Sequence, residues 1–276
     1  MSTVSTAPIV LPHTRGGGRV TQWRVILSEW SKFRSLRSTR YTLLTTVALT
    51  VGLALAAAVA VLTQWSTTTA ADKATFEPLQ VSVVGAAIGV LVIGVLGVLM
   101  MTSEFSTGLV SSTFAAVPRR LPVLWGKAAV YSAIALTVTV PAMLVAFFAS
   151  QAILSSDHLQ TDFGHSGVAR AVFGSALYLT IAGLLGLGLG GVFRSTAAAV
   201  TSLTGVLFVL PLLVTILPAG LSNSISPYLP GNAGRAIMSI TPQAHELSPW
   251  VGLGVFAAYA FAAMAGAAIL LVKRDV

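Results

Sequence analysis

The chain lacks cysteine and is poor in charged residues. None of its 276 residues is cysteine, which excludes a disulfide framework and a thiolate-bound metal. Asp, Glu, Lys and Arg together make up 9% of the sequence, against about 25% in soluble proteins. The sequence also has no G-x-x-x-x-G-K-[ST] motif, so it offers no phosphate-binding loop of that type. These absences argue against a soluble protein and against a chain that hydrolyses ATP by itself.

Apolar residues take the place of the missing charges. They form 55% of the chain, and the mean hydropathy is +0.87. A helix needs about 20 such residues to cross a hydrocarbon core about 30 Å thick. Six stretches without charge or histidine exceed this length: 41–71, 78–103, 128–156, 171–193, 195–234 and 247–272. The sequence therefore predicts an all-α membrane protein with six transmembrane helices, built as one domain over residues 19–276 after a flexible cytoplasmic tail, 1–18.

The basic residues gather on one side of this predicted topology. With the N-terminus inside, only Lys73, Arg170 and Arg235 among the sixteen Lys and Arg residues fall outside. This bias follows the positive-inside rule, so we expect both termini in the cytoplasm and the protein in the cytoplasmic membrane. The net charge of +8 is then a signal of topology and does not indicate binding of nucleic acid.

An amphipathic segment precedes the first span. Trp23, Leu27 and Trp30 recur on one helical face, and Phe33 extends it, while basic residues occupy other positions. Tryptophan at headgroup depth with basic side chains beside it is typical of a helix that lies in the membrane interface and binds lipid. The same pattern would also fit an amphipathic helix packed on protein.

The connection between the second and third spans is patterned as well. Phe105 and Leu109 recur at helical spacing, and Glu104 stands where a helix start would suit a negative charge. We expect a short surface helix at the cytoplasmic mouth. An ordinary solvated loop with membrane-flanking arginines is the alternative.

Three segments together resemble the permease subunit of type-2 ABC exporters, in particular actinobacterial members of that family. They are residues 28–39, residues 104–120 with Lys127, and the outer-loop sequence 228–237. In that family the first segment lies at the cytoplasmic interface. The second is the coupling helix, which docks on a separate ATP-hydrolysing subunit.

The resemblance implies a role for each matching residue. Glu104, Phe105 and Gly108 would belong to the coupling helix, and Arg119 and Arg120 to its exit. The chain would be a transport subunit without enzymatic activity or a cofactor of its own, since ATP and Mg²⁺ would bind the partner ATPase. It would work as a homodimer or with a sister permease and export an amphipathic or apolar molecule such as a drug, lipid or metabolite.

Two self-contained alternatives stay open. A secondary transporter would need ionisable groups or sodium-binding carbonyls within the spans, and the predicted spans contain no charged residue or histidine. An intramembrane serine protease could use Ser166, since residues 164–167 resemble a G-x-S-G motif, but the sixth span has no histidine. His158 and His165 do not have the spacing of a metal-binding H-E-x-x-H motif.

Small residues and prolines predict how the helices pack. Two pairs of glycines stand four residues apart within spans: Gly85 with Gly89, and Gly186 with Gly190. This spacing favours close helix contacts. Pro141 and Pro211 lie inside spans and are expected to bend them. Residues 218–249, rich in Pro, Gly, Ser and Asn, predict short helices at the outer leaflet.

Overall fold

The computed structural model describes residues 22–35, 37–106, 120–241 and 246–273. These residues form helices and connections and contain no strand, which confirms the predicted all-α class. Within these ranges, six helices are long and apolar enough to cross a membrane, so the chain is a multi-pass membrane protein. Five of the six candidate spans each follow one long helix, namely α2 (Arg37–Gln64), α4 (Pro78–Ser106), α6 (Arg120–Leu154), α7 (Val168–Phe193) and α12 (Pro249–Lys273). The span of α6 also takes in the 3-10 helix η1 (Ser155–Asp157) that follows it. The remaining candidate span, Thr196–Val214, combines α8 (Thr196–Thr204), a π-helical turn (Gly205–Val209) and α9 (Leu210–Val214).

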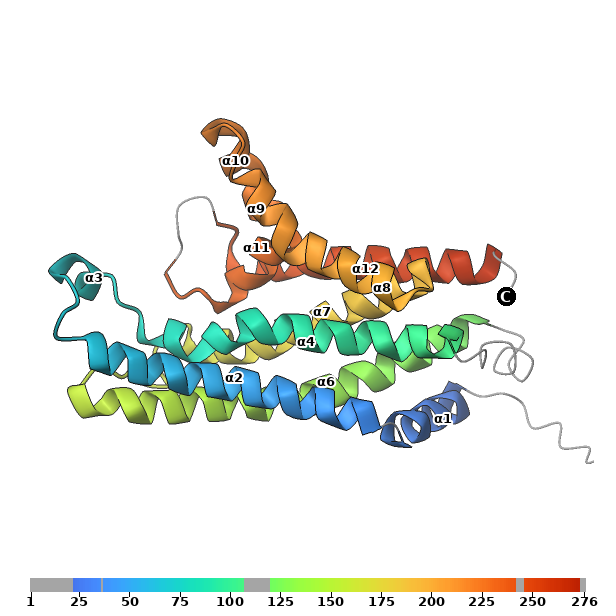
Figure 1. The fold of residues 1–276 in the computed structure, drawn as a ribbon, viewed down its shortest axis with the longest axis horizontal. Coiled ribbons are helices and arrows are strands. Elements are labelled where there is room, and N and C mark those ends of the chain that lie inside the picture. Colours follow the sequence, from blue (N-terminus) through green and yellow to red (C-terminus); the bar gives the residue numbers. More distant parts are fainter. Residues whose placement is uncertain (1–21, 36, 107–119, 242–245, 274–276) are drawn as a thin grey trace, which may run out of the picture.

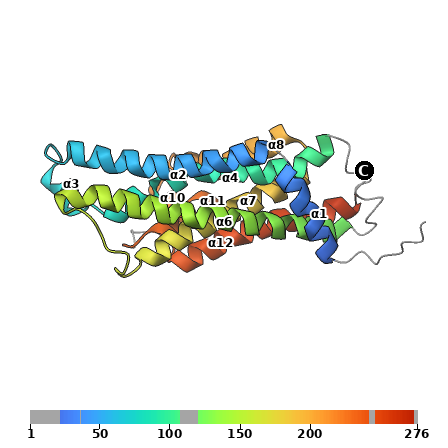
Figure 2. The same ribbon diagram turned by 90° about the horizontal axis from the view of Figure 1, so that it is seen from below.

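The long helices run side by side along the longest axis of the molecule (Figures 1 and 2). One end of the bundle carries α1 (Gln22–Ser35), the end of α4, the start of α6 and the end of α12; we call it the α1 end. The opposite end carries α3 (Ala70–Ala74) and is called the α3 end. The helices α4 and α7 are the most buried, with α2, α6 and α12 packed around them.

Glycines allow α4 and α7 to approach to backbone contact. A Cβ atom on Gly97 would overlap the carbonyl oxygen of Gly183, and one on Gly186 would overlap that of Gly94. On another face of α4, a Cβ atom on Gly85 would overlap the backbone of Thr50 in α2. The packing role predicted for Gly85 and Gly186 is therefore confirmed, since a side chain at either position would separate the helices.

Buried polar groups find partners between the helices. The hydroxyl of Tyr131 donates to the carbonyl oxygen of Ile93 at 3.0 Å. Near the α3 end, the Gln151 amide of α6 donates to the Ser82 hydroxyl of α4 at 2.9 Å, and its oxygen accepts from the backbone N–H of Thr161 at 2.8 Å. A polar group in hydrocarbon is costly without such partners, so these bonds fix how α4 and α6 align.

Several helices are longer than the apolar stretches that predicted them. Helix α6 begins at Arg120, eight residues before the predicted start of its span, so Lys127 lies inside a helix and not in a loop. Helix α4 continues to Ser106, which places Glu104 in its last turn. The prediction that Glu104 stands near a helix start is thus wrong.

The predicted fifth span is not one straight helix. It is interrupted after α8 by the π-helical turn and by Pro211, which lacks a backbone N–H. Helix α9 and helix α10 (Ala219–Ile225) then leave the bundle as a projecting arm, residues 210–225 (Figure 1). By contrast, Pro141 lies inside α6, which continues without interruption to Leu154.

After the arm the chain returns into the bundle through the short helices predicted for this region. They are η3 (Ser226–Tyr228), α11 (Pro230–Arg235) and η4 (Ala236–Met238). Gly234 lies against the rings of Tyr178 and Phe256, and the side chain of Ile237 fills the space beside Gly174. The segment is therefore packed between α7 and α12, with much of it buried.

Candidate functional site: a charge cluster at the α1 end

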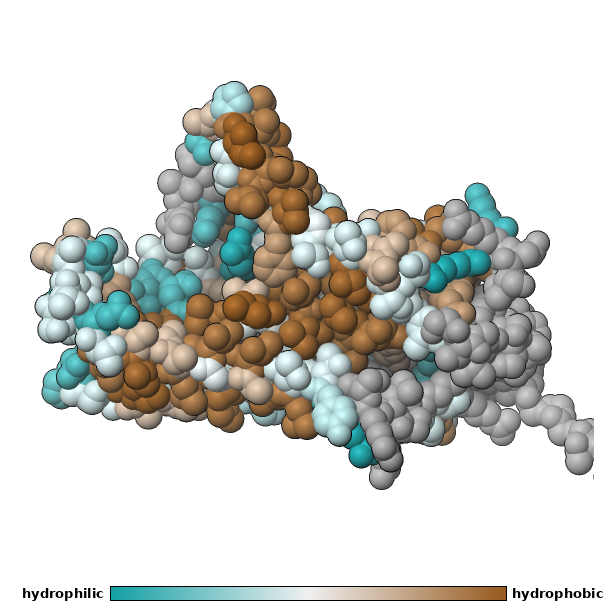
Figure 3. Space-filling view, viewed as in Figure 1, coloured by the Kyte–Doolittle hydropathy of each residue, from teal (hydrophilic) through white to brown (hydrophobic). Residues whose placement is uncertain are grey.

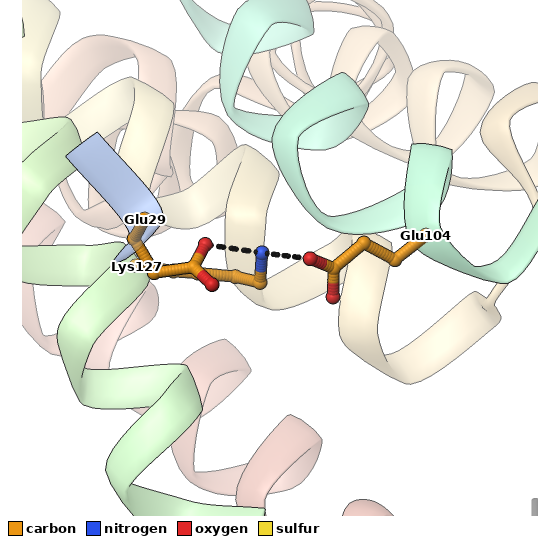
Figure 4. A network of polar contacts seen from close by, with 3 residues as sticks. All are labelled: Glu29, Glu104 and Lys127. Carbon is orange, nitrogen blue, oxygen red and sulfur yellow. Dashed lines mark hydrogen bonds and ion pairs between the residues drawn. The ribbon is translucent and has the colours of Figure 1, made fainter. Parts of the chain in front are cut away.

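Three charged side chains from three helices meet at the α1 end. Lys127 of α6 donates from Nζ to Oε2 of Glu29 in α1 at 2.6 Å and to Oε1 of Glu104 in α4 at 2.7 Å (Figure 4). The side chains of Lys127 and Glu29 are 3% and 2% exposed, and that of Glu104 is 12% exposed. We call these three residues the charge cluster. Short, charge-assisted bonds of this kind are directional, so they fix the three helices relative to one another.

The position of each charge explains why the cluster forms as a unit. Glu104 lies at the C-terminal end of α4, where the helix dipole disfavours a carboxylate. Lys127 offsets that cost from the neighbouring helix, and it lies beyond the first turn of α6, where the dipole of its own helix is weak. Removing Lys127 would take away a cation that both carboxylates contact, and breaking a buried ion pair in this way typically costs about 3–5 kcal/mol.

Further contacts tie the same end of the bundle together. The Gln22 amide of α1 donates to the carbonyl oxygen of Pro122 in α6 at 3.0 Å. The Arg194 guanidinium lies over the Phe105 ring, 5.3 Å from its centroid, and donates to the carbonyl oxygen of Leu270 in α12 at 3.2 Å. The last turn of α4 is therefore joined to α1, α6, α12 and the end of α7.

Arg194 is placed there by an unusual backbone conformation. It follows α7 with φ of 55°, in the left-handed region that residues other than glycine seldom adopt. Its backbone N–H caps the helix by donating to the carbonyl oxygen of Gly190 at 2.9 Å. This abrupt helix end aims the guanidinium at Phe105 and α12.

The structure describes only some of the predicted coupling residues. Glu104 and Phe105 both lie in the last turn of α4, and both side chains face other helices. Arg120 is the first residue of α6, and nothing is described of its side chain. Gly108 and Arg119 lie outside the described residues. The expected surface helix over this connection is thus a prediction that the described residues do not test.

Helix α1 presents two different faces. Trp23, Leu27 and Trp30 are 66%, 46% and 48% exposed, whereas Ile26 packs on the core and Glu29 is buried. Phe33 belongs to α1, but its side chain lies outside the described part. One face of α1 therefore packs on protein, which the alternative of a protein-packed amphipathic helix requires. The face with the tryptophans stays exposed, which a helix in the membrane interface requires.

Sequence reasoning missed the roles of Glu29 and Lys127. A signal for Glu29 existed, because it is the only acidic residue before Asp72 and lies among basic residues. Glu104 is likewise the only acidic residue between Glu77 and Asp157. Such isolated acids within cationic segments are candidates for buried ion pairs.

The residues of the protease and metal interpretations are dispersed. Ser166 is exposed in the loop before α7, and the described hydrogen bonds do not join it to a histidine. His158 and His165 are also exposed, and His245 lies outside the described residues. Within the described ranges, no group of three or more acidic residues and histidines is arranged to hold a metal ion.

No protein-family model matches the chain, and no curated protein matches it either. The family resemblance therefore rests on the three sequence segments alone.

Proposed function

We propose that this chain is the transmembrane permease subunit of a type-2 ABC exporter. It moves an amphipathic or apolar molecule across the cytoplasmic membrane, together with a separate ATPase subunit that binds ATP and Mg²⁺. Two permeases, either two copies of this chain or one copy with a sister chain, enclose the route. The α1 end faces the cytoplasm, so both termini lie on that side.

The charge cluster is the observation that carries this proposal. It joins the two ends of the connection 107–119, because Glu104 lies just before that connection and Lys127 just after it. Glu29 adds α1 to the same junction. A partner that pushes on the connection would thus act on α1, α4 and α6 together. A coupling element needs this property, and an unconnected surface loop lacks it.

The distribution of side chains supports the proposed orientation. Arg40, Arg194 and Lys273 all lie at the α1 end, at the ends of three different spans. Most of the acidic residues of connecting segments lie at the α3 end, with Asp72, Glu77, Asp157 and Asp162 among them. By the positive-inside rule, this distribution supports a cytoplasmic α1 end. The open tryptophan face of α1 suits the lipid headgroups on that side.

The projecting arm offers an apolar surface to its surroundings. Leu212, Ile216 and Leu221 of the arm and the connection within it are 66%, 78% and 56% exposed. In a single chain, this apolar surface stands away from the bundle (Figures 1 and 3). Contact of this apolar surface with water is unfavourable, so lipid or a second permease must cover it.

One observation favours ion-driven transport as a second candidate. The charge cluster contains buried Lys and Glu side chains, the kind of groups that carry protons in secondary transporters. It lies near one end of the bundle, however. Among the described residues, no Asp, Glu, Lys, Arg or His occupies the middle turns of α2, α4, α6, α7 or α12. A proton relay through the described part would therefore be interrupted at mid-depth.

Purification of the tagged chain from its native membrane in mild detergent tests the proposal. Mass spectrometry should identify a soluble ATPase bound in stoichiometric amount. Transport in reconstituted vesicles should then require ATP and persist when an ionophore collapses the ion gradients. Intact tagged protein that repeatedly lacks an ATPase, with transport abolished by the ionophore, would replace the exporter by a secondary transporter.

A substitution locates the coupling element. Gly108→Trp should abolish transport and uncouple ATP hydrolysis while the protein still inserts in the membrane. Val59→Trp is the matched control, because Val59 is 49% exposed on α2 near the α3 end and far from the connection. Equal transport by the two variants would refute the assignment of residues 104–120 to coupling.

A further inference from the structure

A groove opens between α4 and the projecting arm, toward the α3 end. It consists of two adjoining cavities of about 590 and 330 Å³, which share Ala87, Ser226, Asn232 and Arg235. Ala87 lies on α4 about 25 Å along the helix from Glu104, at 1.5 Å per residue. The groove is therefore separate from the charge cluster, and nothing in the proposed coupling mechanism uses it.

The larger cavity is polar. Arg235 lines it and is exposed; its Nη2 donates to Oδ1 of Asn232 at 2.7 Å, and its Nε donates to the carbonyl oxygen of Gly231 at 3.1 Å. These bonds hold the guanidinium plane in place. Within the described part of the chain, the remaining guanidinium donors make no hydrogen bond, so they are available to a ligand. Glu246 lines the same cavity and accepts from the Ser239 hydroxyl at 3.2 Å.

The smaller cavity is mostly apolar and continues from the polar one. Leu207, Phe208, Pro211 and Leu212 line it, and Arg235 stands where the two cavities adjoin. Phe208 and Leu212 are 40% and 66% exposed, so this part of the groove opens sideways. In Figure 3, hydrophilic side chains gather in the angle between the arm and the bundle, and hydrophobic ones cover the arm beside it. A membrane around these spans would place acyl chains at this opening.

We propose that the groove binds an amphiphile with a phosphodiester head group. The phosphate accepts from Arg235, which Asn232 holds in place, and the acyl chain follows Phe208 and Leu212. An arginine next to hydrocarbon needs a counter-charge, and its planar fork matches two phosphate oxygens. Glu246 disfavours a head group with two negative charges, so phosphodiesters bind better than phosphate monoesters. This site goes beyond the proposed function, because it requires neither transport nor an ATPase.

Binding of labelled lipids to the purified full chain in a neutral maltoside detergent tests the site. The probes are fluorescent phosphatidylglycerol and, as a chain-matched neutral control, fluorescent diacylglycerol. Arg235→Gln should weaken phosphatidylglycerol binding at least tenfold and change diacylglycerol binding less than twofold. Phosphatidic acid should compete less well than phosphatidylglycerol. Free glycerol phosphate at millimolar concentration should not displace the probe; displacement would show a site for a soluble phosphate and overturn the amphiphile proposal.

Two matched pairs of variants separate the loss of this site from unspecific effects of a substitution on lipid binding. Lys73→Gln removes a cation at the α3 end but outside the groove, where Lys73 stacks on Trp65, so it should bind like the unaltered protein. Ala87→Trp should fill the junction of the cavities and abolish binding, whereas Ile88→Trp, on the exposed neighbouring position, should not. If Arg235→Gln binds like Lys73→Gln, or Ala87→Trp like Ile88→Trp, the site does not exist. The Ala87 pair decides the question by itself if Arg235→Gln does not fold.

Discussion

Replacing Lys127 by methionine should strongly destabilise the α1 end, because the carboxylates of Glu29 and Glu104, which are 2% and 12% exposed, both accept from its Nζ. Glu29 and Glu104 each bring an oxygen within 2.7 Å of the same nitrogen, so their charges are close neighbours once that nitrogen is gone. At a separation of about 5 Å and an effective dielectric constant of about 20, two such carboxylates repel by roughly 3 kcal/mol. Methionine keeps the length and apolar stem of lysine, so little packing is lost.

The magnitude follows from this geometry. Breaking a buried ion pair by removing one partner costs about 3–5 kcal/mol, whereas replacing the whole set by neutral groups is often close to neutral. The triple variant Glu29→Gln, Glu104→Gln, Lys127→Met should therefore recover most of the loss caused by Lys127→Met alone. At about 2–4 °C per kcal/mol, we expect the single variant to melt roughly 6–20 °C lower and the triple variant within a few degrees of the original.

Thermal unfolding in detergent, followed by the fluorescence of the five tryptophans, measures these differences. Lys127→Arg, which keeps the charge, serves as a second comparison and should lose less than Lys127→Met. Equal melting temperatures for the single and triple variants would refute the electrostatic explanation, since the cost would then come from packing. A shift of less than about 2 °C for Lys127→Met would show that the cluster is not buried in the protein.

Three further predictions concern the rest of the molecule. Gly97→Ala should lower the free energy of unfolding by about 1–3 kcal/mol because the methyl group overlaps backbone, whereas Gly52→Ala, with open space around it, should lower it by less than about 0.5 kcal/mol; thermal melts compare them. Gln151→Leu should cost about 1–3 kcal/mol, because the carbonyl oxygen of Pro78 and the N–H of Thr161 lose the Gln151 amide, while Ser82 keeps its bond to Ser150; melting measures the loss, and an unchanged midpoint would contradict the network. In vesicles with bromine near the headgroups, quenching should weaken when Trp23 is replaced by Phe; equal quenching would mean that this face of α1 does not touch lipid.

The spans were predictable because their signal is local. Each is a long uncharged run, and a run of that length has few alternatives to a helix in a membrane. The helix ends were not predictable in the same way. A predicted span that is defined as an uncharged stretch ends at the first charged residue. A helix, however, continues wherever a charged side chain finds a partner, as Lys127 does in α6. The positive-inside count therefore placed Lys127 in a loop, although its side chain is buried.

The pairing of Glu29 with Lys127 and Glu104 joins residues far apart in sequence, so no spacing within one segment could indicate it. The bend of the fifth span had a local signal in Pro211, but a proline alone does not predict its outcome, because Pro141 leaves α6 continuous. The difference lies in the surroundings. A π-helical turn precedes Pro211, and the chain beyond it forms the arm.

Helix α4 connects the two sites that the fold creates. It carries Glu104 of the charge cluster near its last residue and Ala87 of the groove near its first third. Gly94 and Gly97 bring α4 into backbone contact with α7, so at these two positions the helices touch without an intervening side chain. We therefore expect α4 and α7 to move as one rigid unit, so that a shift imposed at the charge cluster reaches the groove. Gly97→Ala should then weaken the transmission of a shift from the charge cluster to the groove more than it weakens lipid binding. Arg235→Gln should weaken lipid binding more than it weakens this transmission.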